Sequence, residues 1–219
     1  MNREQLTITN MLLLLTFSPV LSAEENWQLK LERDGIQVYT RDVLDSKFDA
    51  VKTSTVIDDI RLNAIVALLN DIPAAEQWTV RCEDAYVYRR ISATESITYN
   101  RSNLPLLYKD RWALWHSLWQ QDNESLQATL KSKITNTNFD TPQNGVRISK
   151  GHVEWQLTPQ ESGGIKVTYS GHVEPGGSLP GWVANMLIKK APLESMINFR
   201  DLVKSPKYRD ANVDFIVEP

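Results

Sequence analysis

The chain has 219 residues, which is enough for one domain with a substantial hydrophobic core. Its 24 Lys and Arg residues and 27 Asp and Glu residues give a net charge of −3 at pH 7, so the composition provides no basic surface for nucleic acid. The single cysteine, Cys82, excludes an internal disulfide and a zinc site made of several cysteines. We expect Cys82 to be a small, partly buried apolar residue, with an intermolecular disulfide as the alternative.

Residues 1–23 have the pattern of an export signal. Arg3 supplies a weak positive charge, residues 11–17 form a short apolar run, and Ala23 is a small residue at the expected cleavage point. The run is shorter than the roughly 20 apolar residues that cross a bilayer. We therefore predict a cleaved signal peptide and a periplasmic protein, with an uncleaved membrane anchor as the alternative. No cysteine follows the run, which excludes a lipoprotein.

Residues 27–57 are predicted to form the first strands of the domain. Alternate side chains are apolar or β-branched over residues 36–40 and 48–57, and Asp34-Gly35 provides a turn. An amphipathic helix is then predicted from Asp58-Asp59 to Ile72. It should end there because a residue that precedes proline avoids helical backbone angles.

The middle of the chain predicts four more strands, at residues 86–92, 94–101, 110–119 and 126–131. A two-residue loop at Asp122-Asn123 would place Leu126 opposite Trp119 and Leu130 opposite Trp115. A loop one residue longer would reverse the two faces of the strand. The face that we expect to point inward with the leucines carries Arg111, Ala113, Trp115, Ser117 and Trp119.

Residues 146–174 predict a hairpin of two strands around a three-residue loop. Their apolar faces coincide in a register that places His152 opposite Glu174 and Glu154 opposite His172. Two histidines and two carboxylates can bind zinc, but these four residues lie on the face opposite the apolar set. We therefore expect solvent-exposed His–Glu contacts, each worth well under about 1 kcal/mol, with a metal site as the alternative.

Residues 174–204 contain the long helix that we predict for this chain. Pro175-Gly176-Gly177 indicates a loop, Ser178 can cap the helix, and Pro180 suits a first helical turn. The helix over residues 181–204 should bend near Pro192, because proline interrupts the hydrogen-bond ladder. The tail at residues 205–219 is predicted to be irregular and without evident function, with a contact of Phe215, Ile216 and Val217 at a sheet edge as the alternative. The helix stripe recurs at three- and four-residue steps, through Leu179, Val183, Met186, Leu187, Lys190, Leu193, Ile197, Arg200 and Asp201.

The sequence carries no recognisable catalytic motif. It contains no Gly-x-Ser-x-Gly segment, phosphate-binding loop or His-Glu-x-x-His segment. His116 lies on an apolar strand, where we expect a hydrogen-bonded structural histidine, with a general base as the alternative. A curled antiparallel sheet closed by a helix can instead leave an apolar pocket. Ordinary core packing would give the same apolar stripes, so periodicity alone does not separate a cavity from a filled core.

Four segments, in order along residues 27–204, carry a family resemblance. They are Asp-Gly-Ile-x-Val-Tyr-Thr-Arg from residue 34, Asn103-Leu104-Pro105 with Asp110-Arg111, Gly-His-Val-Glu-Trp from residue 151, and Pro-Gly-Gly-Ser-x-Pro-x-Trp from residue 175. Together they resemble the START domains, the lipid-transfer domains related to steroidogenic acute regulatory protein. The resemblance implies an α+β helix-grip fold over residues 24–204, in which a curved antiparallel sheet wraps around a long C-terminal helix and encloses a hydrophobic tunnel. It also implies binding of one lipid, with no cofactor and no enzymatic activity.

The resemblance further implies which side chains line the tunnel. Arg111 matches the family's Asp-Arg segment and is the candidate polar anchor, with burial beside Glu95 or a neighbouring aspartate as the alternative. Sterol-binding members place an acidic residue and an arginine in the tunnel, but the matching positions here are Thr98 and Ser117. A sterol held by that pair is therefore not expected. The predicted ligand-binding residues are Arg111, Trp115, Ser117, Trp155, Tyr169, Val183, Met186 and Leu187, with no catalytic or metal-binding residue.

These observations predict an exported carrier of a phospholipid, fatty acid or isoprenoid that contacts membranes transiently. One alternative is an enzyme of the aromatase/cyclase type within the wider helix-grip superfamily. Another is a periplasmic scaffold with a filled core that binds protein partners. A polar pocket around Arg111 and His116 would favour the enzyme, a dry apolar tunnel would favour the carrier, and the lack of a tunnel would favour the scaffold.

Overall fold

The computed structural model describes residues 26–105, 108–138, 144–177, 179 and 181–219. The predicted signal peptide therefore lies outside the described residues. The strands are β1 (Gln28–Arg33), β2 (Ile36–Arg41), β3 (Ala50–Ile57), β4 (Cys82–Arg90), β5 (Glu95–Ser102), β6 (Arg111–Gln121), β7 (Ala128–Ile134), β8 (Val146–Arg147), β9 (Lys150–Pro159) and β10 (Ile165–Glu174). The helices are α1 (Leu62–Asn70), the 3₁₀ turn η1 (Ile72–Ala74), α2 (Ala75–Trp78), α3 (Gly181–Leu202) and α4 (Pro206–Arg209).

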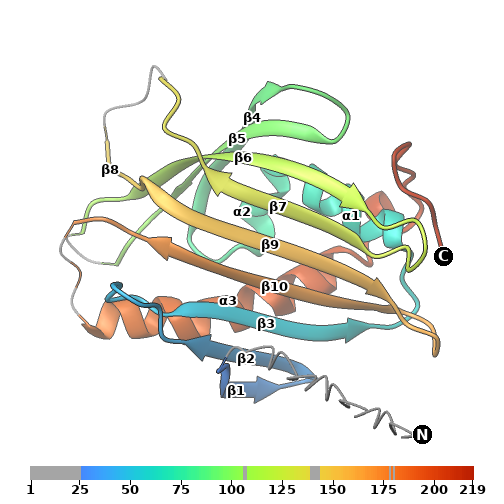
Figure 1. The fold of residues 1–219 in the computed structure, drawn as a ribbon, viewed down its shortest axis with the longest axis horizontal. Coiled ribbons are helices and arrows are strands. Elements are labelled where there is room, and N and C mark those ends of the chain that lie inside the picture. The colour runs from blue at the N-terminus through green and yellow to red at the C-terminus, as the bar shows by residue number, and fades with distance from the viewer. Residues whose placement is uncertain (1–25, 106–107, 139–143, 178, 180) are drawn as a thin grey trace, which may run out of the picture.

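The strands form one curved sheet with the helices on one side (Figure 1). Its order is β1-β2-β3-β10-β9-β7-β6-β5-β4, and every neighbouring pair along this path is antiparallel, while β8 pairs with β6 in parallel. The α+β prediction of a curved antiparallel sheet with a long C-terminal helix is confirmed. Among the described residues, no helix is both long and apolar enough to cross a membrane.

The first elements follow the predicted pattern, with one shifted boundary. Asp34 and Gly35 have φ values of 53° and 73° and form the turn between β1 and β2. The predicted helix start at Asp58 is wrong, because α1 begins at Leu62. Asp59 has φ 53°, a left-handed conformation that does not continue a right-handed helix. The predicted end before Pro73 is close, since α1 stops at Asn70.

The pairing of β6 with β7 differs from the predicted register but keeps the predicted face. Trp119 lies opposite Leu130, and Leu126 belongs to the turn, where it has φ 54°. Asp122 Oδ1 shapes this longer turn by accepting a hydrogen bond of 2.8 Å from the Ser125 backbone N–H. The register has moved by an even number of residues, so the odd-numbered face of β6 still points inward.

The hairpin of β9 and β10 shows the same kind of correction. Trp155 lies opposite Tyr169, and His152 lies opposite His172, so the predicted His152–Glu174 and Glu154–His172 pairs are wrong. The connecting loop extends over residues 160–164, and the Gln160 backbone N–H closes it by donating a hydrogen bond of 3.1 Å to the Gly164 carbonyl. The longer loop moves the register by an even number of residues, so both apolar faces still point inward.

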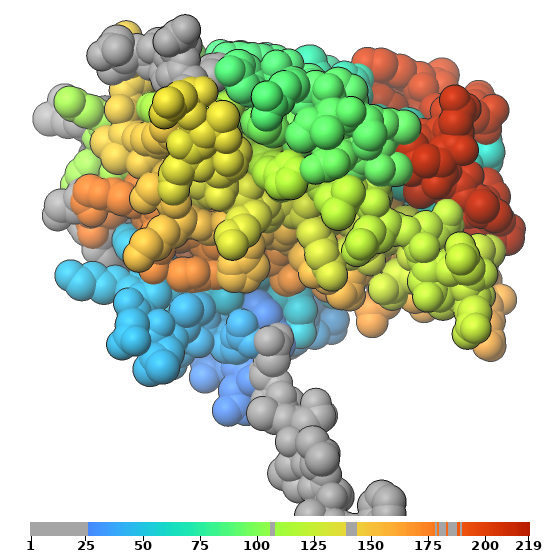
Figure 2. All heavy atoms as spheres, turned by 45° about the horizontal axis from the view of Figure 1, so that its top comes forward, coloured from blue at the N-terminus to red at the C-terminus, as the bar shows by residue number. Residues whose placement is uncertain are grey.

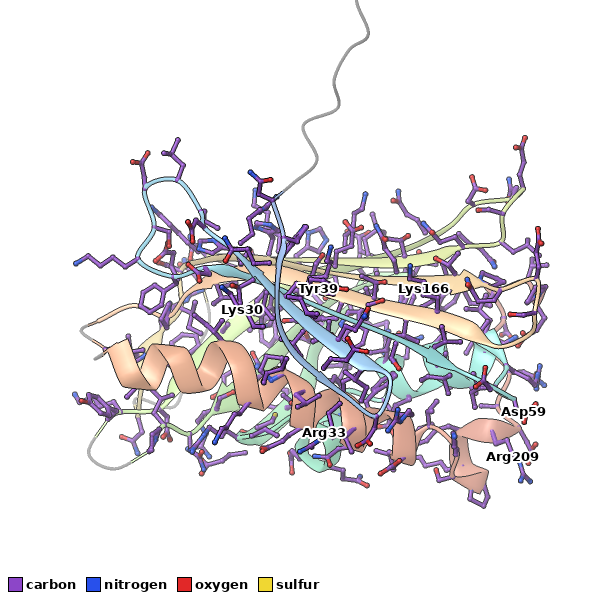
Figure 3. The ribbon with its side chains drawn as sticks, turned by 90° about the horizontal axis from the view of Figure 1, so that it is seen from below. Lys30, Arg33, Tyr39, Asp59, Lys166 and Arg209 are labelled. Atoms are coloured by element: carbon purple, nitrogen blue, oxygen red, sulfur yellow. The ribbon has the colours of Figure 1, made fainter. Side chains whose placement is uncertain are left out.

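The long helix is confirmed as α3, with Pro192 inside it. Figure 3 shows α3 beneath the sheet, with the β1–β2 edge crossing over it, and Arg200 donates a hydrogen bond of 2.6 Å to the Asp34 carbonyl in that edge. The predicted stripe is confirmed at Leu193 but wrong at Lys190, which is exposed, and at Ile197, which is only partly buried. The predicted cap at Ser178 and the first-turn Pro180 lie outside the described residues. The buried positions after Pro192 are Leu193, Met196, Phe199 and Val203.

The C-terminal tail packs against the domain, and most of it lacks regular secondary structure, as predicted. Residues 206–209 form α4, and the buried Ile216 belongs to the main core. Gln121 at the end of β6 exchanges two hydrogen bonds with the backbone of Val217. Figure 2 shows this segment in red, beside the turn that follows β6. The Glu218 carboxylate accepts hydrogen bonds from the first backbone N–H groups of α1, which caps that helix.

The sheet is packed on both faces at β5 and β6. The main core fills the space between the inner face and the helices, and it includes Trp119 from the odd-numbered side of β6. The even-numbered side carries Trp112 and Leu114, which form a second cluster with Ile97 and Tyr99 on the other face. The guanidinium of Arg147 in β8 lies 5.0 Å from the centre of the Trp112 ring and covers this cluster.

Candidate ligand-binding cavity

A cavity of about 390 Å³ lies between the inner face of the sheet and the helices α2 and α3. This volume falls within the range of small-molecule pockets in proteins. Most of the side chains around it are apolar or aromatic. The sheet contributes Val51, Thr53, Asn100, Ser102, Arg111, Trp155, Tyr169, Gly171 and Val173; the helices contribute Trp78, Ile188, Ala191, Pro192, Ser195 and Met196; the loops contribute Phe48, Asp49, Thr79, Val80, Arg81, Asn103, Leu104, Ile148 and Pro175.

The strand alternation explains which residues reach the cavity. On β10, every second residue from Tyr169 to Val173 lines it, and the neighbouring strands β3 and β9 contribute Thr53 and Trp155, both in register with Tyr169. Position 171 requires glycine for this packing, because a Cβ atom there would clash with Val153 Cγ1 at a distance of 2.6 Å. Loops from one end of the sheet, at the left of Figure 1, complete the lining.

An aromatic cluster forms the inner wall of the cavity. Trp78 at the end of α2 makes edge contacts with Trp155 of β9, with ring centres 5.7 Å apart, and with Phe199 of α3, 5.1 Å apart. Trp155 also packs on Tyr169, with ring centres 4.9 Å apart. Burial raises the pKa of the Tyr169 hydroxyl to about 12, so this phenol is neutral near pH 7. The cluster joins sheet and helices without introducing a charge.

Arg111 is buried and binds backbone carbonyls. Its guanidinium donates hydrogen bonds to the carbonyl oxygens of Pro175, Gly176 and Lys109, at 2.8, 3.0 and 2.5 Å. Burial lowers the pKa of Arg111. The alternative of a buried pairing with Glu95 is wrong, because that carboxylate instead lies 2.6 Å from His116 Nε2 on the outer face. Arg111 therefore ties the start of β6 to the loop that leads into α3.

The cavity brings together three of the predicted ligand-binding residues, Arg111, Trp155 and Tyr169. Three others have well-defined positions outside its lining. The Trp115 indole donates a hydrogen bond of 2.7 Å to Asn100, the Ser117 hydroxyl lies 2.8 Å from the Ser132 hydroxyl, and Val183 is fully buried. The side chains of Met186 and Leu187 lie outside the described residues.

Sequence reasoning missed several lining residues, of which Thr53 and Trp78 are the most informative. The alternation of residues 48–57 placed Thr53 on a shared face but did not show that this face borders a cavity. Trp78 occupies the end of a helix of four residues, which leaves no periodic signal. The polar character of an inward strand position was the one available indication of Thr53.

The histidines of the hairpin lie away from the cavity, on the outer face of the sheet. The rings of His152 and His172 have centres 6.4 Å apart. His172 Nε2 lies 3.0 Å from Ser46 Oγ and 3.1 Å from the Phe48 carbonyl, so it holds the loop between β2 and β3. Within the described part of the chain, no three or more His, Cys, Asp and Glu side chains are placed to hold a metal ion.

Comparisons with known proteins agree with this arrangement. The START domain model matches residues 10–207. An uncharacterized protein of Pseudomonas aeruginosa is 29% identical over 80% of this chain and 86% of its own length, and the phosphatidylcholine transfer protein of Bos taurus is 25% identical over 85% and 86%. The solved structure of a STAR-related lipid transfer protein from Xanthomonas axonopodis has the same fold, with a TM-score of 0.74 and 24% identity over 82% of this chain and 99% of that one. The chain belongs to the START domain family, whose helix-grip fold places the cavity between the sheet and α3.

Proposed function

We propose that this protein is an exported carrier that binds one hydrophobic ligand in the cavity beneath α3 and transfers it between membranes. The observation that carries the proposal is the cavity itself, about 390 Å³ in volume and bordered mainly by apolar and aromatic side chains. Burial of a methylene contributes about 0.8 kcal/mol, so a chain of about 16 carbons supplies roughly 13 kcal/mol before ordering costs. A phospholipid, fatty acid or isoprenoid offers such a chain.

The names of similar proteins support the transfer part of the proposal. The bovine relative is a phosphatidylcholine transfer protein, and ceramide transfer proteins of Xenopus also match the chain. The pattern of residues 1–23 supports export to the periplasm. A carrier in that compartment would meet two membranes, with brief contact at each.

The chemistry of the lining favours a carrier over an enzyme of the aromatase/cyclase type. Among the described residues that line the cavity there is no histidine and no cysteine. His116, the candidate general base, lies on the outer face beside Glu95, and the guanidinium of Arg111 is engaged by backbone carbonyls. Among the described lining residues, Asp49 is the one carboxylate, so proton transfer to a bound substrate would depend on that group alone.

The test is native mass spectrometry of the protein expressed with its full N-terminus and purified from the periplasm, followed by extraction of bound lipid. We expect a mature chain that begins after Ala23 and carries one ligand. Ala191→Trp should remove the ligand by filling the cavity, because Ala191 is a lining residue of α3. Glu194→Trp is the matched control, since Glu194 lies exposed on the same helix.

Transfer is then measured between donor and acceptor vesicles with the ligand class that the extraction identifies. A wild-type chain without bound mass that also fails to take up lipid from vesicles would contradict the carrier. Equal ligand occupancy in Ala191→Trp and Glu194→Trp would show that binding takes place elsewhere. Binding without transfer would leave a lipid-binding protein and remove the transfer step.

A further inference from the structure

A second hollow lies on the outer face of the sheet, beside the loop between β2 and β3. It has a volume of about 650 Å³ and is open to solvent. Residues 43–46 of the loop line it together with the adjoining ends of β7, β9 and β10. Figure 3 shows this loop above the sheet, on the side away from α3. We call this hollow the outer groove.

Side chains of both charges border the outer groove. Lys133 of β7 and Lys150 of β9 supply two ammonium groups, while Asp45 of the loop and Glu174 of β10 supply two carboxylates. In the sheet, Lys133 lies opposite His152, and Lys150 lies opposite Glu174. The two ammonium groups and the two carboxylates balance, so the groove is bipolar and favours a ligand that carries both charges.

Three of these charged groups have no internal partner. The side chains of Asp45, Lys133 and Lys150 are exposed and form no ion pair or hydrogen bond within the described part of the chain. Glu174, in contrast, lies 3.5 Å from Nε2 of His172. Isolated surface charges are usually solvated, but here charges of opposite sign border one hollow without contacting each other. A molecule that bears both charges can bridge them through charge-assisted hydrogen bonds.

An exposed apolar side chain and the ligand cavity adjoin the same groove. Leu44, in the loop between β2 and β3, borders the outer groove and is 90% exposed. Binding to a membrane surface combines burial of apolar side chains with electrostatic attraction to head groups. The same loop continues to Phe48 and Asp49, which line the ligand cavity. Contact at the outer groove therefore brings the ligand cavity close to the membrane.

We propose that the outer groove binds the zwitterionic head group of a membrane phospholipid, in which a phosphate is linked to a primary ammonium. The ammonium groups of Lys133 and Lys150 donate hydrogen bonds to the phosphate oxygens, and the lipid ammonium donates to the Asp45 carboxylate. A purely anionic head group fits less well, because it meets Asp45 and Glu174. The proposal rests on the proposed function, which requires membrane contact, and it adds the docking surface and the class of lipid.

The test measures flotation of the purified protein with vesicles of three compositions. These are phosphatidylcholine alone, and phosphatidylcholine mixed equally with phosphatidylethanolamine or with phosphatidylglycerol. For the wild type we expect the tightest binding to the vesicles that contain phosphatidylethanolamine. Lys133→Ala should weaken this binding about 5-fold, the usual contribution of one lysine at a charged membrane surface. Asp45→Asn should weaken binding to phosphatidylethanolamine but strengthen binding to phosphatidylglycerol, because it removes a carboxylate that attracts the ammonium and repels an anion.

The opposite ends of the same strands offer matched controls outside the outer groove. Lys166 is exposed on the outer face of β10, and Asp59 is exposed after β3 with a φ of 53°, close to the 60° of Asp45. Lys166→Ala and Asp59→Asn change the net charge by the same amounts and should leave vesicle binding nearly unchanged. Leu44→Ser should weaken binding to all three compositions, whereas Val217→Ser, at a side chain that is 62% exposed elsewhere, should not.

Three outcomes would overturn the proposal at the level of the groove. If Lys133→Ala and Lys166→Ala weaken binding equally, the membrane is attracted by the charge of the whole sheet face and not by the groove. If phosphatidylglycerol vesicles bind the wild type best and Asp45→Asn changes nothing, the selection for a zwitterion is wrong. If soluble glycerophosphoethanolamine binds but no vesicle does, the groove is a site for a small molecule.

The native mass spectrum of the same preparation separates this proposal from the carrier function. A wild type that carries one lipid but floats with none of the three vesicles contradicts docking through the groove and leaves ligand binding intact. A wild type that carries no lipid, takes none up and does not float contradicts the carrier, and the docking surface fails with it.

Discussion

Arg111 lines the cavity, but its guanidinium also holds two segments of the backbone together. The guanidinium donates hydrogen bonds to carbonyls of two separate segments, that of Lys109 before β6 and those of Pro175 and Gly176 after β10. A planar group with several donors in fixed directions suits such a set of acceptors. The loop that leads into α3 is therefore held by one side chain.

Replacing Arg111 should lower the free energy of unfolding of the domain. Arg111→Ala leaves buried carbonyls without donors, and we expect the free energy of unfolding to fall by about 2–4 kcal/mol in urea titrations. Arg111→Lys should recover only part of this loss, because a single ammonium does not reach all three oxygens. A stability within about 0.5 kcal/mol of the wild type for Arg111→Ala would show that these hydrogen bonds are not maintained in solution.

The residues of the candidate site illustrate what the sequence could and could not predict. Arg111, Trp155 and Tyr169 were found because a family segment or strand alternation placed them on an inward face. Thr53 and Tyr169 become neighbours only through the pairing of β3 with β10, which are far apart in the chain. No local pattern predicts that pairing, so the sequence did not show that Thr53 borders the cavity.

At the scale of elements, strand faces were predictable but registers were not. The period of two residues fixes which side chains share a face, and this holds for β6, β7, β9 and β10. Loop lengths depend on turn chemistry, such as the Asp122 carboxylate that binds the Ser125 N–H. The predicted apolar stripe of α3 differs from the observed one for a related reason, because small errors in helix phase accumulate over 22 residues.

The contact between α1 and α4 should make stability depend on acid pH. Asp71, which follows α1, accepts a hydrogen bond of 2.7 Å from the Tyr208 hydroxyl and another from Lys207. Burial acts to raise the pKa of Asp71, but these hydrogen bonds outweigh it and the pKa is lowered overall. A carboxyl whose pKa is lower in the folded state contributes stability above its unfolded pKa, about 3.9, and loses it as pH falls through the folded value.

Asp71→Asn should therefore be less stable than the wild type at pH 7, and the difference should shrink below about pH 4. Thermal unfolding of both proteins between pH 7 and pH 3 measures this change. Asp201→Asn, at an exposed position on α3, serves as the control. A stability difference that stays constant over the whole pH range would contradict a role for the Asp71 charge.

At the scale of the whole molecule, the order of the family segments predicted the fold, but packing alone decides whether the sheet encloses space. The cavity is bordered by elements from β3 to α3, and the close packing of its wall depends on residues such as Gly171, which has no side chain. Apolar periodicity describes a filled core and a lined cavity equally well. The volume therefore had to come from the three-dimensional arrangement.

The two-sided burial of β6 has a consequence for how the molecule opens. Trp119 packs on one face of this strand and Trp112 on the other, while the edge strand β1 is mostly exposed. Backbone amides of β5 and β6 should therefore exchange with deuterated water only through global unfolding, and those of β1 should exchange early. If the slowest amides instead lay in β1 or α3, the rigid part of the protein would be elsewhere. Slow exchange in β5 and β6 combined with faster exchange in α3 would locate the opening of the cavity at the wall where α3 meets the sheet.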